Sequence, residues 1–196
     1  MKAIFTKIGR FFKGIHAWVW DFSDQKPPWL VKIMTILTVL SVQFLWLWCV
    51  TAILSLTGKM SLLQDASYWQ VIGVNKAEFL AQQSILSSVF FGCVMAPLWE
   101  DAVFRGAVIS RTQALFPGDN RQLIYAIVVS SVLFGILHGG VVNVLIQGVG
   151  GLFLSYVYLK NGNCILSAMI MHSLYNLVII LVGIFMRTNL LLHALG

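Results

Sequence analysis

The chain contains a run of 24 residues, from Ile33 to Leu56, that has no charged side chain. About 20 consecutive apolar residues are enough for a helix to cross the hydrocarbon core of a bilayer, where every backbone amide must find its hydrogen bond inside the segment. The run is too long for the apolar region of a secretory signal peptide and lacks a small-x-small cleavage site. It therefore predicts a membrane-spanning helix and restricts the rest of the chain to folds that share a bilayer.

The composition extends this restriction to the whole chain. Of the 196 residues, 59% are hydrophobic and only 10% are charged, whereas an average soluble domain carries about 25% charged residues. So few charges cannot cover the surface of a water-soluble domain of this length, and the apolar excess must face lipid. A water-soluble globule is excluded.

Four further apolar runs follow the first one. They cover residues 79–99, 122–138, 141–159 and 164–186, and the second continues into an amphipathic stretch that ends at Pro117-Gly118. Residues 58–78 are polar enough to form a loop. We therefore predict an all-α fold, a polytopic transmembrane helical bundle of about five to six membrane helices, with residues 29–196 as one domain.

Residues 1–28 form a basic amphipathic segment, in which residues 4–19 are predicted to form a helix at the membrane interface; a disordered basic tail is the alternative. Apolar side chains recur there at helical spacing, basic side chains fall on the opposite arc, and Pro27-Pro28 ends the segment. This pattern favours anionic lipid as the partner and not nucleic acid.

The distribution of positive charge predicts the orientation of the chain. With the N-terminus inside, ten of the 13 Lys and Arg residues lie in inner segments: six before Ile33, and then Arg105, Arg111, Arg121 and Lys160. Inner loops carry such an excess under the positive-inside rule. We therefore expect an integral membrane protein with a cytoplasmic N-terminus.

A few polar residues stand within or beside the predicted spans, where an ionised side chain costs about 2.5 to 3.5 kcal/mol on insertion scales. They are Glu100, Asp101, Arg105, His138 and His172, with Asn176 as an uncharged companion. Asp101 and Arg105 are four residues apart on one helix face, which predicts an ion pair. Glu100 points about 100° away from Asp101 and is left free to act as a base.

The two histidines add hydrogen-bonding groups to this set. His138 follows Phe134 by four residues, so we expect the phenyl ring to pack beneath the imidazole. His172 and Asn176 have the same spacing and are expected to point toward one place. Both can donate hydrogen bonds to a developing oxyanion.

The rise of an α-helix gives the expected depths of these groups. Glu100 lies roughly 16 Å from Arg111, and His138 lies roughly 25 Å from Arg121. Counted this way, His138 lies about two turns above the level of Glu100, and either a tilt of the helices or a third span that begins deeper than Arg121 would close the gap.

A metal site has to be weighed against a metal-free one, because Glu100, His138 and His172 also make a set of zinc ligands. The sequence has no His-Glu-x-x-His motif and no local ligand cluster, so three different helices would have to supply the ligands. We favour no cofactor, and zinc bound by these three residues is the alternative.

Three segments carry a resemblance to a known family. They run from Trp99 to Gly106, from Ser130 to His138 and from His172 to Asn176, and the stretch 147–162 between them is similar to a glycine-rich fourth helix and turn. In this order they resemble the motifs of the CPBP family, the CAAX-protease and bacteriocin-processing membrane proteins. The family is also called Abi or type II CAAX prenyl endopeptidase-like. The resemblance covers about residues 95–180.

The resemblance implies an intramembrane endopeptidase that cuts a membrane-associated or secreted peptide or protein near its end. In this family pattern Glu100 would be the general base that activates water, and His138 would hold the same water. His172 and Asn176 would form the oxyanion site. The chemistry agrees with the residue types, which supply a base and charge-stabilising donors.

The second acidic position departs from the family pattern. The family has a second glutamate where this chain has Asp101, which is one methylene shorter. The resemblance implies that Arg105 fixes the carboxylates. So short a form of the family fits the cytoplasmic membrane of a bacterium, where bacteriocin or pheromone processing or self-immunity are the implied roles.

Two other functions use the same features. A non-catalytic bacteriocin-immunity or membrane scaffold protein could use this fold to bind a partner without cutting it. A transporter or proton pathway would also need intramembrane acids and histidines. The absence of an internal repeat in the sequence disfavours the transporter.

Overall fold

The computed structural model describes residues 27–59, 85–139 and 141–195. Within these ranges 89% of the residues are helical and none lies in a strand, which confirms the predicted all-α fold. The predicted interfacial helix and most of the predicted loop at 58–78 lie outside the described residues.

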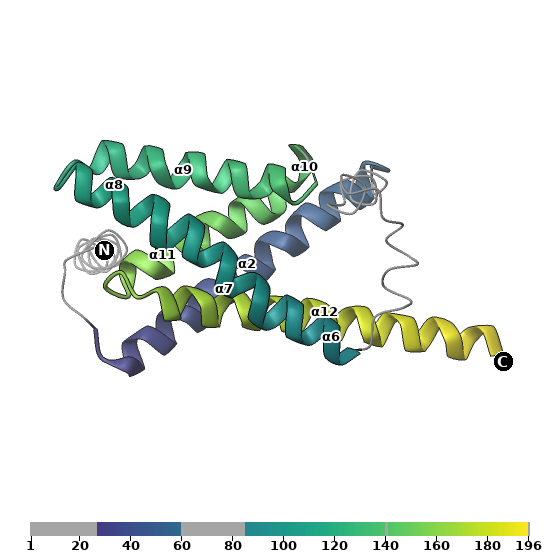
Figure 1. Cartoon of the computed structure of the whole chain (residues 1–196). Helices are drawn as coiled ribbons and strands as arrows, with labels where there is room; N and C mark the ends of the chain where they lie inside the picture. The colour runs from purple at the N-terminus through teal and green to yellow at the C-terminus, as the bar shows by residue number, and fades with distance from the viewer. Residues whose placement is uncertain (1–26, 60–84, 140, 196) are drawn as a thin grey trace, which may run out of the picture.

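The described helices follow one another with few breaks. They are α2 (Trp29–Leu56), α6 (Ile85–Phe90), η1 (Phe91–Met95), α7 (Ala96–Asp101), η2 (Ala102–Ile109), α8 (Ser110–Leu115), α9 (Asn120–Leu137), α10 (Val141–Asn143), η3 (Val144–Gly148), α11 (Val149–Lys160) and α12 (Ile165–Leu195). The segments labelled η are π-helical turns. The run from α6 to α8 is one continuous helix, as Figure 1 shows.

Four of the described helices are long and apolar enough to cross a membrane. They are Trp29–Leu56, Ile85–Leu115, Asn120–Leu137 and Ile165–Phe185. The predicted span at 141–159 corresponds to a shorter apolar helix, Val144–Lys160. Because that helix is covered by protein on several sides, its length does not have to match the bilayer.

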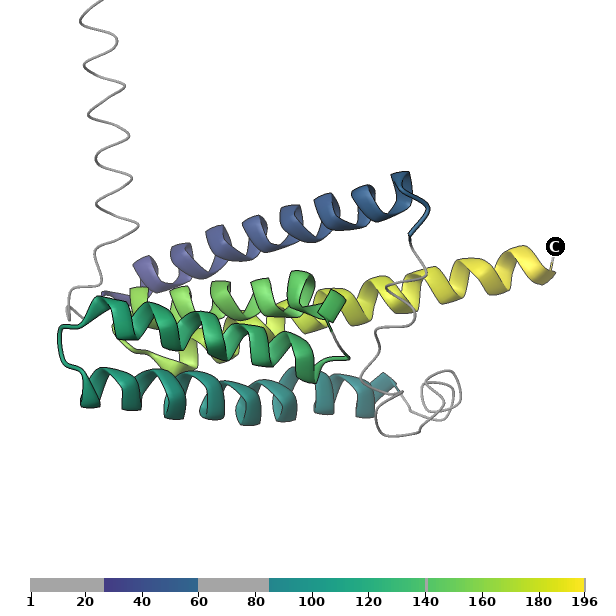
Figure 2. The same ribbon diagram turned by 90° about the horizontal axis from the view of Figure 1, so that it is seen from above.

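The helix α11 is the centre of the bundle. Figure 2 shows α9, α11 and α12 between α2 on one side and the continuous α6-to-α8 helix on the other. Two apolar clusters join α11 to its neighbours, one made of Ile36, Val39, Leu154, Val157 and Met171, the other of Ile109, Tyr158, Leu159 and Ala168. The core therefore consists of contacts from α2, η2 and α12 to this central helix.

Side chains satisfy backbone carbonyls in the π-helical segments. The indole Nε1 of Trp46 donates to the Leu145 carbonyl in η3 over 2.6 Å, and the Ser110 hydroxyl donates to the Arg105 carbonyl in η2 over 3.3 Å. An unpaired carbonyl within a bilayer costs several kcal/mol. These bonds make the irregular turns compatible with a membrane protein.

The hairpin of α9 and η3 brings two backbones into direct contact. A Cβ atom added at Gly135 would lie 2.5 Å from the Cα of Val144, and the next nearest atoms are also backbone atoms. Only glycine permits this approach, and the hairpin fixes the position of the residue that follows α9.

We predict that Gly135→Ala lowers the free energy of unfolding by about 1 to 3 kcal/mol, because overpacking forces two backbones apart. Thermal unfolding of the purified protein in detergent measures the effect. Gly183→Ala is the matched control, since a Cβ at Gly183 meets no atom within 4 Å. Equal effects of the two substitutions would contradict the proposed backbone contact.

Candidate active site

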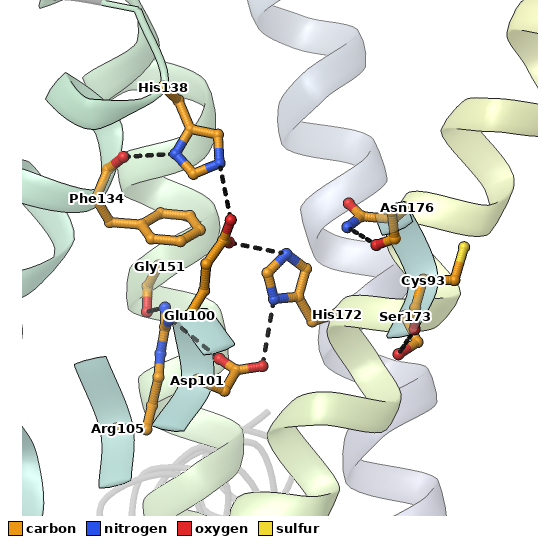
Figure 3. Close-up of polar contacts among 11 residues, drawn as sticks. Cys93, Glu100, Asp101, Arg105, Phe134, His138, Gly151, His172, Ser173 and Asn176 are labelled. Atoms are coloured by element: carbon orange, nitrogen blue, oxygen red, sulfur yellow. Dashed lines mark hydrogen bonds and ion pairs between the residues drawn. The ribbon is translucent and has the colours of Figure 1, made fainter. Parts of the chain in front are cut away.

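The candidate active site lies where three helical segments meet. Glu100 and Asp101 end α7, His138 follows the last residue of α9, and His172 lies on α12. Figure 3 shows these side chains turned toward one another, although His172 is 71 residues from Asp101 along the chain.

Asp101 and Arg105 form a buried ion pair. Their Oδ1 and Nη1 atoms are 3.1 Å apart, and the side chains are 0% and 1% exposed, which confirms the predicted pairing. The contact lacks hydrogen-bond geometry at these atoms. Arg105 donates through Nη2 to the Gly151 carbonyl over 3.0 Å, and its guanidinium carbon lies 5.0 Å from the centre of the Phe134 ring. The arginine is thus held by charge, by the α11 backbone and by an aromatic face.

Asp101 also holds His172. Its Oδ2 atom lies 3.2 Å from Nδ1 of the imidazole. A carboxylate only accepts hydrogen bonds, so Nδ1 carries the hydrogen and Nε2 faces the other way. Because Asp101 is enclosed between Arg105 and His172 and is not exposed, it occupies a supporting position in the site.

His138 is oriented by its own helix end. Its Nδ1 atom donates to the Phe134 carbonyl over 2.7 Å, and the two ring centres are 4.4 Å apart, which confirms the predicted packing. The Asn143 amide donates to the His138 carbonyl over 2.7 Å. The sequence analysis missed Asn143. An amide five residues after His138 in an apolar stretch was the available signal.

Glu100 faces both histidines. Its Oε1 lies 3.9 Å from Nε2 of His138, and its Oε2 lies 3.6 Å from Nε2 of His172. These distances are too long for direct hydrogen bonds, and the buried Oε2 has no hydrogen-bond partner among the described residues. In the neutral rings both Nε2 atoms are acceptors, so four acceptor atoms converge, two from Glu100 and one from each histidine. A water molecule would satisfy two of them with its two hydrogens.

The separation in depth between Glu100 and His138 that was counted from the charged residues is too large. Arg111 does not mark the helix end, because α8 continues to Leu115. Counted from the true ends, Glu100 lies roughly 22 Å from Leu115 and His138 roughly 27 Å from Asn120, a difference of about one turn. Figure 1 shows the α6-to-α8 helix tilted relative to α9, and Oε1 of Glu100 lies 3.9 Å from Nε2 of His138.

The expected convergence of His172 and Asn176 is also wrong. The Asn176 amide donates to the Gly92 carbonyl over 2.7 Å, and in Figure 3 it lies apart from the carboxylates. Ser173 donates to the neighbouring Cys93 carbonyl over 2.6 Å. Both acceptors belong to η1, whose carbonyls need donors from outside the segment. That need was not visible in the spacing of His172 and Asn176.

The fit of the site to zinc depends on three side chains. No group of three or more His, Cys, Asp or Glu residues in the described ranges is placed to hold a metal ion. Glu100, His138 and His172 come nearest, with the separations of 3.6 and 3.9 Å. Ligand atoms of a tetrahedral zinc are about 3.3 Å apart, so the ion would need these groups to close by several tenths of an ångström.

Comparison with known proteins gives a family for the part of the chain that holds the site. Residues 82–178 match the family model described as type II CAAX prenyl endopeptidase Rce1-like, which confirms the resemblance carried by the three motifs. The chain is also similar to an uncharacterized protein of Mycoplasma capricolum subsp. capricolum, with 35% identity over 115 residues. That match covers 57% of this chain and 30% of the relative, so the chain spans less than a third of the relative's length. No solved structure matches.

We predict that Asp101→Asn lowers the free energy of unfolding by about 3 to 5 kcal/mol, because it leaves the Arg105 charge buried without its partner. Denaturant unfolding in detergent measures this loss. The double variant Asp101→Leu with Arg105→Met should regain much of it, since no charge remains buried.

Asp119→Asn is the matched control for the same change of side chain. Asp119 is an exposed cap of α9 that accepts from backbone amides, and asparagine caps a helix equally well. A similar loss at both positions would contradict a special role for the buried pair.

Proposed function

Because residues 82–178 match the family model of the Rce1-like type II CAAX prenyl endopeptidases, we propose that this membrane protein hydrolyses a peptide bond in a membrane-associated or secreted peptide or protein. The observation that carries the proposal is the convergence of Glu100, His138 and His172 from three helices. Peptide hydrolysis requires a base that activates water and donors that stabilise the oxyanion. The three side chains can supply both.

Glu100 is the proposed general base. A water held beside Glu100 Oε1 and His138 Nε2 has one acceptor for each of its hydrogens, because Nδ1 of His138 is already committed to the Phe134 carbonyl. Glu100 takes a proton as the water oxygen attacks the scissile carbonyl carbon. The same proton then passes to the leaving amine as the carbon–nitrogen bond breaks, which returns the carboxylate to its starting state.

His172 is the proposed donor to the oxyanion. Its Nδ1 hydrogen is held by Asp101, so donation to the oxyanion uses a second proton on Nε2, the ring atom that lies 3.6 Å from Oε2 of Glu100. Asn176 is engaged with Gly92. Of His172 and Asn176, we therefore assign only His172 as the donor to the oxyanion.

The proposed orientation rests on basic residues at one end of the bundle. Lys32 is in the first turn of α2, Arg111 in α8, Arg121 in the first turn of α9, and Lys160 ends α11. These helix ends gather at one side of Figure 1. Under the positive-inside rule this side is cytoplasmic, and because α2 begins there, we propose a cytoplasmic N-terminus. A bacterial cytoplasmic membrane is the proposed location.

We predict that the full chain in lipid nanodiscs cleaves a fluorogenic peptide and that Glu100→Gln lowers kcat/KM by about 10²- to 10⁴-fold, the usual contribution of a general base. His138→Ala should lower it by a similar factor. The two probes are a farnesylated Cys-aliphatic-aliphatic-X peptide and an unprenylated peptide library.

Ser41→Ala is the control for handling and folding, because the Ser41 hydroxyl is exposed and bonds only within its own helix. Cleavage that persists with a strong chelator supports the metal-free mechanism. Loss with chelator and recovery with zinc would move Glu100, His138 and His172 into a metal site. A folded protein that cleaves neither probe would contradict the peptidase and favour an immunity or scaffold protein.

A further inference from the structure

A proline interrupts the hydrogen bonds of the helix that carries the candidate base. Pro97 is fully buried and lies three residues before Glu100. It has no N–H group, so it cannot donate to the Cys93 carbonyl as in an α-helix, or to the Gly92 carbonyl as in a π-helix. The N–H of Ala96, the α-helical donor to Gly92, donates instead to the Phe91 carbonyl. The two carbonyls of Gly92 and Cys93 therefore lose their usual donor.

Two side chains of α12 replace that donor. Asn176 donates to the Gly92 carbonyl over 2.7 Å, and Ser173 donates to the Cys93 carbonyl over 2.6 Å. The two donors are three positions apart in the sequence, so they share one face of α12. Figure 3 shows both bonds beside the catalytic side chains. Pro97 leaves one carbonyl without its α-helical donor and the bond from Ala96 to Phe91 leaves the other, and one turn of a neighbouring helix supplies a donor to each.

The same turn of α12 carries His172. This histidine precedes Ser173 and contacts both carboxylates of α7, with 3.6 Å to Glu100 and 3.2 Å to Asp101. The approach between the helices is close, since a Cβ at Gly92 would lie 3.1 Å from Cδ1 of Ile180. The position of Glu100 relative to His172 is therefore set on one side by direct contact and on the other by the two bonds to η1.

We propose that Ser173 and Asn176 are positioning residues, which hold the two carbonyls freed by Pro97 and so fix Glu100 against His172. The effect on rate rests on the proposed peptidase function, whereas the effect on η1 does not. Asn176 acts in this arrangement through the backbone of the helix that bears Glu100. The bond to Gly92 uses one of the two hydrogens of the Asn176 amide, and the proposal concerns this bond.

The proposal makes Pro97 and the two donors energetically coupled. If Asn176 only replaces the N–H that Pro97 lacks, then Pro97→Ala restores a backbone donor and makes Asn176 dispensable. An oxyanion donor would behave differently, because its loss would cost the same with or without the proline. A double-mutant cycle separates the two roles.

We predict that Asn176→Ala speeds amide hydrogen exchange in residues 91–96 by about tenfold or more, as expected when a buried acceptor loses its donor. The measurement uses the full chain in nanodiscs with mass-spectrometric detection. In the Pro97→Ala background the same substitution should change exchange by less than about twofold. Ser173→Ala and Asn176→Asp should behave like Asn176→Ala, because none of them donates to the carbonyl.

Peptide cleavage in the same variants tests the effect on Glu100. We expect Asn176→Ala to lower kcat by about 10- to 100-fold with little change in KM, since misplacement of a catalytic group by about 1 Å has this cost. The loss should shrink in the Pro97→Ala background. Ser41→Ala is the control, because the Ser41 hydroxyl donates only to a carbonyl of its own helix.

Each result assigns a role. An equal loss of kcat in both backgrounds with unchanged exchange would overturn the proposal and return Asn176 to the oxyanion. Faster exchange with unchanged kcat would leave only a structural role and would also overturn it. Coupled exchange in a protein that cleaves no peptide would preserve the two bonds to η1 and remove the peptidase function instead.

Discussion

The buried charge pair of Asp101 and Arg105 is the interaction on which the arrangement of the site depends. An ion in a low-dielectric interior is tolerated only when a partner and hydrogen bonds compensate its lost hydration. The compensation here comes from three directions: the Gly151 carbonyl, the Phe134 ring and the His172 imidazole. The need to compensate this one buried ion pair thus holds α11, α9 and α12 against α7 and brings the reactive groups together.

A second constraint is the backbone itself, which must find hydrogen bonds without water. Regular α-helices satisfy it locally, but the π-helical turns and Pro97 do not. In α2, α8 and α12 the chain meets this need with side-chain donors, among them Trp46, Ser110 and Asn176. The polar residues of the spans therefore divide into those that handle charge and those that complete the backbone, and only the first group has to be near the reaction.

Sequence patterns predicted those features that depend on neighbours along the chain. The apolar runs predicted the spans, and four-residue spacing predicted the Asp101–Arg105 pair and the packing of Phe134 on His138. The four-residue spacing of His172 and Asn176 did not predict the partner of Asn176, because that partner is a carbonyl 84 residues away. The counted separation in depth between Glu100 and His138 was too large, because the end of α8 was placed at a charged residue. Hydropathy and spacing do not reveal π-helical turns, so contacts that depend on them were not predictable.

The difference of one methylene between the two adjacent acids explains how they can have different tasks. Asp101 is short enough to remain enclosed while it reaches Arg105 one turn along its own helix and Nδ1 of His172 across the interface. Glu100 is longer, is 23% exposed, and reaches the Nε2 atoms of both histidines. A glutamate at position 101 would have to fit an extra methylene into a space with no exposed surface, and either the ion pair or the imidazole would shift. The shorter acid is therefore suited to the packing of this chain, and its role as a support is compatible with Glu100 acting as the base.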